Sequence, residues 1–345
     1  MPRGSSAAAP ASPAVSGDGL DVASGGESGD GLGVVSGPVV CIVGPTASGK
    51  SDLAERVALE LGSDVISVDS MQVYRGMDVG TAKTPVASRR VPLRMVDVVA
   101  PDVDFSASEF QRLARALVDE RLGRGVVPVL CGGTGLYLDA VIDEMSFPRG
   151  ETRGPDRARY ERIAEEEGAE RLWELLRSRD AASAEVIHPN NVRRVVRALE
   201  LLDGGSSYAR VHEGLLRRDP HYDARIWGVS IDRALLYARI DRRVDQMVES
   251  GLVEEVRGLL AGGLSSDTTA MQAIGYKEIA AALSGSLSLD EAVELVKRRT
   301  RRYAKRQLSW LRRDGRTRWI DVGATGAEEA ARIIASDARG SHGSR

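Results

Sequence analysis

The sequence is poor in aromatic residues and cysteine, and it has neither a long apolar run nor a strong excess of one charge. Phe, Trp and Tyr make up 4% of the 345 residues, whereas 42% are hydrophobic, which is typical of a helix-rich protein with a sizeable aliphatic core. The 47 basic and 50 acidic residues give a net charge of −3, which argues against a uniformly basic nucleic-acid binder. No stretch approaches 18 apolar residues, so we expect no membrane span.

Cysteine and histidine are too few and too scattered to predict a metal site or a disulfide framework. Cys41 and Cys131 both lie in apolar runs that are typical of buried strands, where a thiol packs as a small core side chain. The four histidines show no ligand spacing. We therefore predict no His or Cys metal site and a reducing, cytoplasmic compartment. The first residues also lack the continuous apolar segment of a signal peptide.

The order of patterns along the chain predicts an α/β fold with a P-loop NTPase-like parallel sheet, flanked by helices and carrying a helical insertion or lid. Short β-branched runs such as VVCIV, DVISVD, RMVDVV and VPVLCGG alternate with amphipathic stretches, which is typical of βαβ units. The later text predicts a strand at 227–232, helices at about 233–249, 252–262, 270–283 and 289–313, and a last strand in RWIDV. The predicted organisation is a disordered extension at 1–36, the first part of the core at 37–151, a helical insertion at 152–222, core completion with basic C-terminal helices at 223–338, and a polar tail at 339–345.

The most specific motif is GPTASGKS, residues 44–51, which matches the phosphate-binding pattern G-x-x-x-x-G-K-[ST] between a β-rich run and an amphipathic helix. Glycines let backbone N–H groups converge, and the following helix N-terminus adds partial positive charge. Lys50 offers a point charge to a diphosphate, and the Ser51 hydroxyl can bind Mg²⁺. The motif is specific for phosphate but says nothing of what carries the phosphate.

Two further turns follow predicted strands, so they are expected at the same sheet edge as the phosphate loop. Asp69 ends the strand of DVISVD and can serve as a Mg²⁺ ligand, as a general base toward a second substrate, or as a simple turn cap. Gln72 follows it and can hydrogen-bond an incoming ligand. In CGGTGLYLDA, two glycines allow close approach of another molecule, and Thr134 offers a hydroxyl or caps the next helix.

Basic side chains gather in two helical segments. HPNNVRRVVRALE carries Arg193, Arg194 and Arg197, for which a solvated helix face is the ordinary interpretation. VKRRTRRYAKRQLSWLRR, residues 296–313, holds nine Lys and Arg residues and no acid, and such a density of like charge favours a polyanionic partner. In a chain of net charge −3, this stripe indicates a nucleic-acid contact.

Taken together, GPTASGKS, DSMQVYRGMDVGTAK, GGTGLYLDA, HPNNVRRVVRALE, AIGYKEI and YAKRQLSWLRR closely resemble the tRNA dimethylallyltransferases, also called tRNA isopentenyltransferases, of bacterial type. The motifs occur in the family's order from about Val39 to Val322. The resemblance implies transfer of a dimethylallyl group from dimethylallyl diphosphate to N6 of the adenosine 3′-adjacent to the anticodon (position 37), in tRNAs that read codons beginning with U. It also implies Mg²⁺ as cofactor, the anticodon stem-loop of tRNA as partner, and a monomer.

The resemblance also implies roles for individual residues. Asp69 would be the base, Thr134 would orient the N6 amine, and Lys50 would stabilise the leaving diphosphate. The expected diphosphate or nucleotide contacts are Gly44, Pro45, Thr46, Ala47, Ser48, Gly49, Lys50 and Ser51, with Arg239 or Arg243. The expected tRNA contacts are Asp69, Ser70, Met71, Gln72, Thr134, Arg157, Arg193, Arg194, Arg197, Arg298, Arg301 and Arg302. Ser51 is the expected metal ligand.

Three other functions fit parts of the sequence. A free adenine-nucleotide isopentenyltransferase shares the loop and the donor but has little use for the arginine helices. A P-loop small-molecule kinase would bind ATP and transfer a phosphoryl group. A non-catalytic tRNA-binding protein would explain the basic stripe but not the phosphate loop or Asp69.

Overall fold

The computed structural model describes residues 37–147, 155–216 and 218–340, and within them six parallel strands form one sheet in the order β3-β2-β4-β1-β5-β6. The strands are β1 (Pro38–Val43), β2 (Val65–Val68), β3 (Leu93–Arg94), β4 (Val129–Gly132), β5 (Asp223–Ser230) and β6 (Arg318–Asp321). Parallel strands need crossover connections, and α1 (Lys50–Leu61) between β1 and β2 and α2 (Ala107–Gly123) between β3 and β4 supply two of them. The predicted parallel α/β fold is confirmed.

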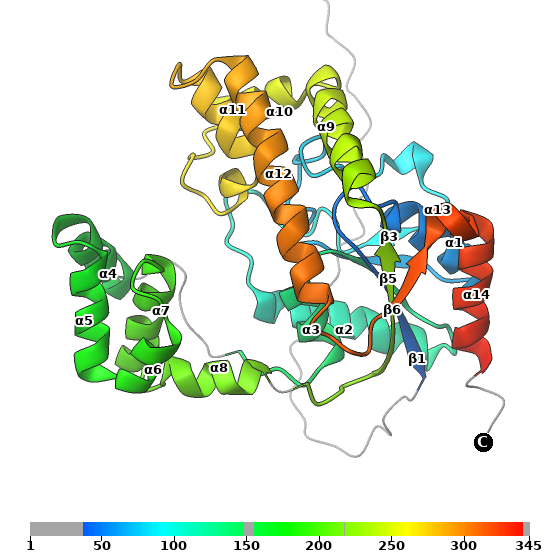
Figure 1. Ribbon diagram of the computed structural model, residues 1–345, viewed down its shortest axis with the longest axis horizontal. Coiled ribbons are helices and arrows are strands. Elements are labelled where there is room, and N and C mark those ends of the chain that lie inside the picture. Colours follow the sequence, from blue (N-terminus) through cyan, green and yellow to red (C-terminus); the bar gives the residue numbers. More distant parts are fainter. Residues whose placement is uncertain (1–36, 148–154, 217, 341–345) are drawn as a thin grey trace, which may run out of the picture. The chain divides into compact units, whose positions relative to one another are not determined.

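Alternate side chains of the strands enter two separate cores, one on each face of the sheet. Val39 and Cys41 of β1 lie in a cluster with side chains of α2 and α3 (Gly135–Ile142). Val40 and Ile42 lie in a second cluster with α1 and α14 (Ala327–Gly340), and these two helices pack against each other (Figure 1). Because both faces are covered, the central strands are continuously apolar, as buried parallel strands require.

The three central strands end at the same level. Val43 of β1 pairs with Gly132 of β4, and Val68 of β2 pairs with the same glycine. A Cβ at Gly132 would lie 1.9 Å from the Val68 carbonyl oxygen, so only glycine fits at this position. The phosphate loop, Asp69 and the GGTG turn therefore leave the sheet side by side, at the carboxyl edge where α/β sheets bind ligands.

Residues 155–216 contain only helices and carry their own apolar cluster, built around Tyr160, Leu172, Val196 and Leu199. The helices are α4 (Pro155–Glu166), α5 (Ala169–Arg179), α6 (Ala181–Val186), α7 (Val192–Asp203) and α8 (Tyr208–Leu216). We call this segment the insertion. The chain segments before and after the insertion pair with each other: Asp143 forms an antiparallel bridge with Pro220, and the Glu144 N–H donates to the Asp219 carbonyl at 2.7 Å. We call these paired segments, residues 143–144 and 219–220, the root of the insertion.

The C-terminal part of the core contains α9 (Arg233–Glu249), α10 (Leu252–Ala261) and α12 (Leu289–Leu311), which confirms three of the predicted helices to within two residues. The predicted helix at 270–283 is instead a 3₁₀ turn η2 (Ala270–Gln272) followed by α11 (Tyr276–Leu283). Gly275 has a φ of 101° between them, which a continuous right-handed helix does not accommodate. A short α13 (Val322–Thr325) precedes α14. Within the described ranges, we find no helix that combines the length and apolarity needed to span a bilayer.

The strand predicted in RMVDVV is wrong beyond its first residue. Only Leu93 and Arg94 pair with β2, because Met95 and Asp97 both adopt left-handed φ values, 58° and 56°. The chain leaves the sheet there and follows the loop after β2, where the Asp97 N–H donates to the Gln72 carbonyl at 3.1 Å. Tertiary contacts with this loop override the local β-branched pattern.

Parts of the predicted organisation lie outside the described residues. The extension at 1–36 and residues 341–345 of the tail fall there, as do residues 148–154, which include the end of the predicted core segment and the start of the predicted insertion. The last helix runs to Gly340, two residues into the segment predicted as a tail.

Candidate active site

The phosphate loop joins β1 to the N-terminus of α1. Gly49 caps α1 with a φ of 93°, and Ala47 adopts a φ of 63°, so the chain curls tightly before the helix. Lys50 folds back, and its Nζ donates to the Pro45 carbonyl at 3.2 Å. The buried Ser48 hydroxyl has no hydrogen-bond partner among the described residues. A curled loop at a helix N-terminus presents backbone N–H groups to an anion.

Asp69 begins the turn after β2 and shapes it through its own side chain. Its Oδ1 accepts hydrogen bonds from the N–H groups of Met71 at 2.8 Å and Gln72 at 3.3 Å. Thr134, at the start of α3, accepts a hydrogen bond from the Ser70 N–H through Oγ1 at 3.3 Å. The turn after β2 and the turn after β4 are thereby fastened to each other, and the second oxygen of Asp69 takes no hydrogen bond from any described residue.

Arg243 rather than Arg239 reaches the phosphate loop. Its Nη1 lies 3.5 Å from the Thr46 Oγ1, and its side chain lines the pocket described below. Arg239, one turn earlier on α9, is exposed and does not line it. The sequence left both arginines open, and the structure brings one of them to the loop.

A cavity of about 330 Å³ lies between the phosphate loop, the Asp69 turn, α9 and α12. Of the predicted residues, it brings together Thr46, Lys50, Ser51, Asp69, Ser70, Met71, Gln72 and Arg243. One wall is apolar and is made by Ile240, Val244, Met247, Ile274 and Val296. The cavity therefore has a cationic end at Lys50 and Arg243, a carboxylate at Asp69, and an apolar side between helices.

Sequence reasoning missed one side of this cavity. Val296, Thr300, Tyr303 and Gln307 of α12 all line it, and their spacing of three or four residues places them on one helix face. That spacing is visible in the sequence, but the basic residues between these positions make the segment resemble a solvent-exposed helix rather than the wall of a cavity. Arg306 also lines the cavity and lies over the Tyr303 ring, 5.6 Å from its centroid.

Burial and the charges around the cavity shift the pKa values of several groups. Burial lowers the pKa of Lys50 below its ordinary value; Arg243 acts in the same direction, and Asp69 opposes it. Burial likewise lowers the pKa of Arg243, again opposed by Asp69. Burial raises the pKa of Tyr303 to about 12, and the Asp69 carboxylate contributes to the rise. An anion bound between Lys50 and Arg243 would favour the charged forms of both, so the cationic end is suited to a diphosphate.

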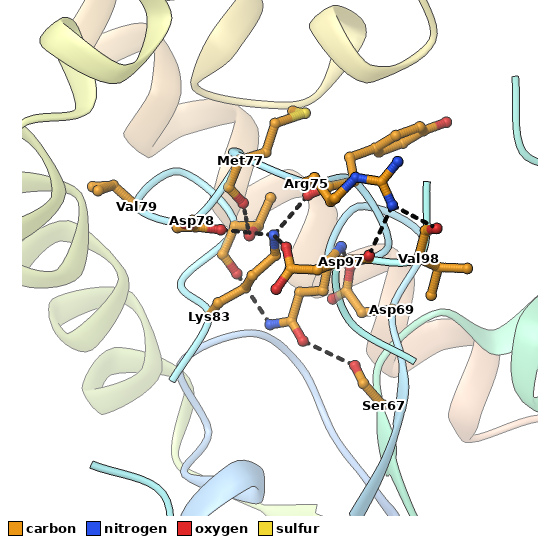
Figure 2. Close-up of polar contacts among 12 residues, drawn as sticks. Ser67, Asp69, Arg75, Met77, Asp78, Val79, Lys83, Asp97 and Val98 are labelled. Carbon is orange, nitrogen blue, oxygen red and sulfur yellow. Dashed lines mark hydrogen bonds and ion pairs between the residues drawn. The ribbon is translucent and has the colours of Figure 1, made fainter. Parts of the chain in front are cut away.

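The loop at 69–84 is held by a buried ammonium group (Figure 2). Lys83 Nζ donates to the Tyr74 carbonyl at 2.6 Å and forms ion pairs with Asp78 at 2.7 Å and Asp97 at 2.6 Å. The Gln72 amide has its own two partners: Oε1 accepts from the Ser67 hydroxyl at 2.9 Å, and Nε2 donates to the Thr81 carbonyl at 3.2 Å. The side chain of Gln72 is therefore fixed before any ligand binds.

A carboxylate from α10 fastens the far end of the same loop. Glu255 accepts three successive backbone N–H groups, those of Asp78 and Val79 at 2.8 Å and Gly80 at 3.1 Å, and the Tyr276 hydroxyl at 2.5 Å. A Cβ at Gly80 would lie 2.4 Å from the Tyr276 ring, so the loop must carry glycine there. Nothing in the local sequence marks Glu255, because its backbone partners lie 175 to 177 residues away.

The basic stripe predicted at 296–313 has two sides. On one side the basic residues form ion pairs. Lys297 pairs with Asp245 and Glu294. Arg299 pairs with Glu278, and Arg301 pairs with Asp241. The other basic residues are exposed and have no ion pair with the described residues. They are Arg298, Arg302, Lys305, Arg306, Arg312 and Arg313, which share one face of α12 and its C-terminal end. We call this set the basic face.

The arginines predicted for the insertion divide in the same way. Arg193 and Arg194 are exposed on α7 and form no ion pair with the described residues. Arg197 and Arg157 both approach Glu200, at 3.6 Å and 3.4 Å. Burial of Glu200 raises its pKa, although both arginines oppose this.

Comparisons with known proteins agree with this geometry. The family described as IPP transferase matches residues 72–314. The tRNA dimethylallyltransferase of Desulforudis audaxviator (strain MP104C) is 46% identical over 299 residues, which cover 85% of this chain and 95% of the relative. The chain belongs to the tRNA dimethylallyltransferase family. The family match includes the insertion and all of α12, whereas the phosphate loop and Asp69 precede it.

Two solved structures share the fold of this tRNA dimethylallyltransferase family member. The full-length tRNA isopentenylpyrophosphate transferase of Bacillus halodurans has a TM-score of 0.64 at 41% identity, covering 88% of this chain and 98% of that chain. A eukaryotic dimethylallyltransferase acting on tRNA has a TM-score of 0.74 at 26% identity, covering 90% and 80%. Both alignments therefore span most of this chain.

Proposed function

We propose that this chain transfers a dimethylallyl group from dimethylallyl diphosphate to N6 of the adenosine 3′-adjacent to the anticodon in tRNA, releasing diphosphate. The observation that carries the proposal is the composition of the cavity. A cationic end at Lys50 and Arg243 suits a diphosphate, and an apolar wall from Ile240 to Val296 suits a branched C5 chain. Asp69 lies in the same cavity, where it can accept a proton from an amine.

The reaction requires a bond from the adenine N6 to the allylic C1 and cleavage of the bond from C1 to the diphosphate oxygen. Negative charge develops on the departing diphosphate, where Lys50, Arg243 and the loop N–H groups are already placed to stabilise it. The N6 proton passes to the free oxygen of Asp69. Thr134, fastened to Ser70, orients the amine. Holding the donor and the amine in this arrangement makes their reaction effectively unimolecular, which lowers its barrier.

Mg²⁺ fits the oxygen groups at this end of the cavity. Ser51 lines it, and hydroxyl and phosphate oxygens are among the ligands that Mg²⁺ prefers, which leaves the second oxygen of Asp69 to accept the proton. Bound there, Mg²⁺ would offset charge on the diphosphate. No cluster of three or more His, Cys, Asp or Glu residues occurs in the described part of the chain, so the substrate phosphates and water would complete the coordination.

We infer that the basic face of α12, with Arg193 and Arg194 of the insertion, binds the phosphates of the anticodon stem-loop. The adenosine must leave the stacked bases of the loop to reach Asp69. This costs a few kcal/mol and needs firm protein contacts to the neighbouring nucleotides.

Each chain carries the cavity, so we propose that the enzyme acts as a monomer in the cytoplasm, where tRNA is available.

The test is an assay of the purified protein with Mg²⁺, dimethylallyl diphosphate and an unmodified anticodon stem-loop that contains adjacent adenosines. Parallel reactions replace the stem-loop with AMP, or the donor with ATP, and mass spectrometry identifies the products. We expect gain of one C5 group on the loop adenosine alone. Gain on AMP would indicate a free-nucleotide isopentenyltransferase, and phosphorylation from ATP would indicate a kinase; either would overturn the proposal. Binding without any product would leave a tRNA-binding protein.

A further inference from the structure

The side chain of Gln307 makes the direct polar link between the phosphate loop and the turn that carries Thr134. Its Oε1 accepts the Thr46 N–H at 2.9 Å, and its Nε2 donates to the Gly133 carbonyl at 3.0 Å. The residue is 6% exposed and lies 261 residues from Thr46 in the sequence. One amide group thus joins the phosphate loop to the GGTG turn.

The surrounding backbone is shaped to admit this side chain. A Cβ at Gly133 would lie 2.1 Å from Gln307 Nε2, so glycine is required for the contact. Gly135 is equally restricted by the Trp310 ring, with a closest distance of 2.1 Å. Gln307 and Trp310, one turn apart on α12, therefore dock this helix into the GGTG turn.

Only an amide satisfies both partners. Thr46 presents an N–H and needs an acceptor, whereas Gly133 presents a carbonyl and needs a donor. A carboxylate would lack the donor, and an aliphatic side chain would leave two polar backbone groups without a partner. The bridge thus depends on an N–H and a carbonyl oxygen in one side chain.

We propose that Gln307 is a positioning residue for prenyl transfer, which sets the distance between the diphosphate-binding loop and the Thr134 turn. This inference rests on the proposed function. In that reaction the allylic C1 is held from the Thr46 side and the N6 amine from the Thr134 side. Reacting atoms must come within about 3–3.5 Å, and an error of about 1 Å costs on the order of 100-fold in rate. A link that spans both loops therefore controls kcat more than substrate affinity.

The experiment compares wild-type enzyme with Gln307→Leu and Gln307→Glu, measuring kcat, both KM values, stem-loop affinity and the thermal midpoint. For Gln307→Leu we expect kcat to fall about 10- to 100-fold, with both KM values and the stem-loop Kd within about threefold of wild type. For Gln307→Glu we expect the same loss in kcat and, in addition, a higher KM for dimethylallyl diphosphate, because a new negative charge stands beside the phosphate loop.

Leu311→Ala is the matched control, because Leu311 is buried one turn further along α12 and makes no polar bridge. It should lower the thermal midpoint at least as much as Gln307→Leu while keeping kcat within about threefold at an assay temperature below all midpoints. The proposal fails if Gln307→Leu keeps its kcat, or if Leu311→Ala loses as much kcat as Gln307→Leu. If wild type itself forms no prenylated product, the proposed function fails first and the positioning role with it.

Discussion

At the scale of single residues, the cavity depends on side chains that do two things at once. Asp69 closes a turn with Oδ1 and also lines the cavity, while Thr134 begins a helix and fastens a neighbouring turn. A substitution at such a position can change geometry as well as chemistry. The variants below therefore preserve the shape of the side chain and alter its charge.

The first prediction concerns the base. Asp69→Asn keeps an oxygen that can accept the Met71 and Gln72 N–H groups, so the turn should persist while the carboxylate is lost. We expect kcat to fall about 10²- to 10⁴-fold, the range of general-base contributions. Stem-loop affinity, measured by gel shift, should stay within about twofold. Equal losses in affinity and turnover would contradict the assignment of Asp69 as the base.

The second prediction concerns Asp139, buried at the root of the insertion beside Asp143 and the Arg218 guanidinium. Burial raises the pKa of Asp139 to about 6, opposed by Arg218. The folded state therefore binds more protons than the unfolded chain between pH about 4 and 6, and the free energy of unfolding falls as pH rises through that window.

Asp139→Asn should remove the free-energy cost of burying a charged carboxylate, and the asparagine side-chain oxygen can still accept a hydrogen bond from Arg218. We expect the variant to match wild type near pH 4 and to be more stable at pH 7.5, by up to about 2–3 kcal/mol. Urea unfolding across this pH range measures the difference. A variant that is less stable than wild type at pH 7.5 would mean that the Arg218 ion pair outweighs the burial of charge.

The residues of the site that could be predicted from sequence all follow strands or belong to a contiguous motif. Lys50, Asp69 and Thr134 each lie in, or at the end of, the turn that follows an apolar strand, so the topology of a parallel sheet brings them together. Gln307 and Glu255 could not be predicted in this way. Their partners are backbone groups more than 170 residues away, and nothing in the local sequence marks a side chain that will meet a distant carbonyl or N–H.

At the scale of elements, the two faces of α12 lie in different environments. Its buried face lines the cavity through Thr300, Tyr303 and Gln307, and its basic face is exposed. The sequence predicted the helix and its charge but not which charges remain unpaired. Three of the basic residues are paired with acids that all precede the stripe in the sequence. These acids lie on α9, on α11 and in the N-terminal half of α12.

The third prediction separates these charges. Arg302→Gln removes an exposed guanidinium, whereas Arg301→Gln removes its neighbour that pairs with Asp241. For Arg302→Gln we expect weaker stem-loop binding and a slope of log K against log salt that is reduced by about 1. For Arg301→Gln we expect little change in slope. The triple variant at Arg298, Arg302 and Lys305 should add these effects, and an unchanged slope would remove the basic face from the interface.

Errors in the predicted elements share one physical cause. The helix expected at 270–283 breaks at Gly275, and the strand expected in RMVDVV ends at Met95, in both cases where the backbone adopts a positive φ. Gly275 is visible as a possible break, but Met95 and Asp97 carry no such sign. Met95 and Asp97 adopt positive φ values because the ion pair between Lys83 and the Asp97 carboxylate holds this segment against the loop after β2.

At the scale of the whole molecule, the insertion and the core have separate apolar clusters. The cluster around Tyr160 and Leu199 contains residues of the insertion alone, and the two clusters on the faces of the sheet contain none of them. The chain enters and leaves the insertion at one root, between Glu144 and Asp219. A segment joined in this way can be replaced by a short connection without altering the sheet.

The fourth prediction follows from this separation. Replacing residues 147–217 by a short Gly/Ser linker should leave a core that unfolds cooperatively in urea and binds dimethylallyl diphosphate with Mg²⁺, measured by calorimetry. Prenylation of the stem-loop should fall at least about 100-fold, because Arg193 and Arg194 are removed. Full activity of the shortened chain would show that the insertion has no part in tRNA binding, and loss of diphosphate binding would show that the core requires it.

The strand order also determines when the sheet can be completed during synthesis. β1 is made first and pairs with β4 on one side, but its other neighbour, β5, emerges only after all five helices of the insertion. Until then the nascent chain carries an apolar strand with one open edge, a surface that invites pairing with other chains. The ribosome must therefore deliver about 90 residues between β4 and β5 before that edge closes, and the speed of translation through the insertion becomes a determinant of how much protein escapes aggregation.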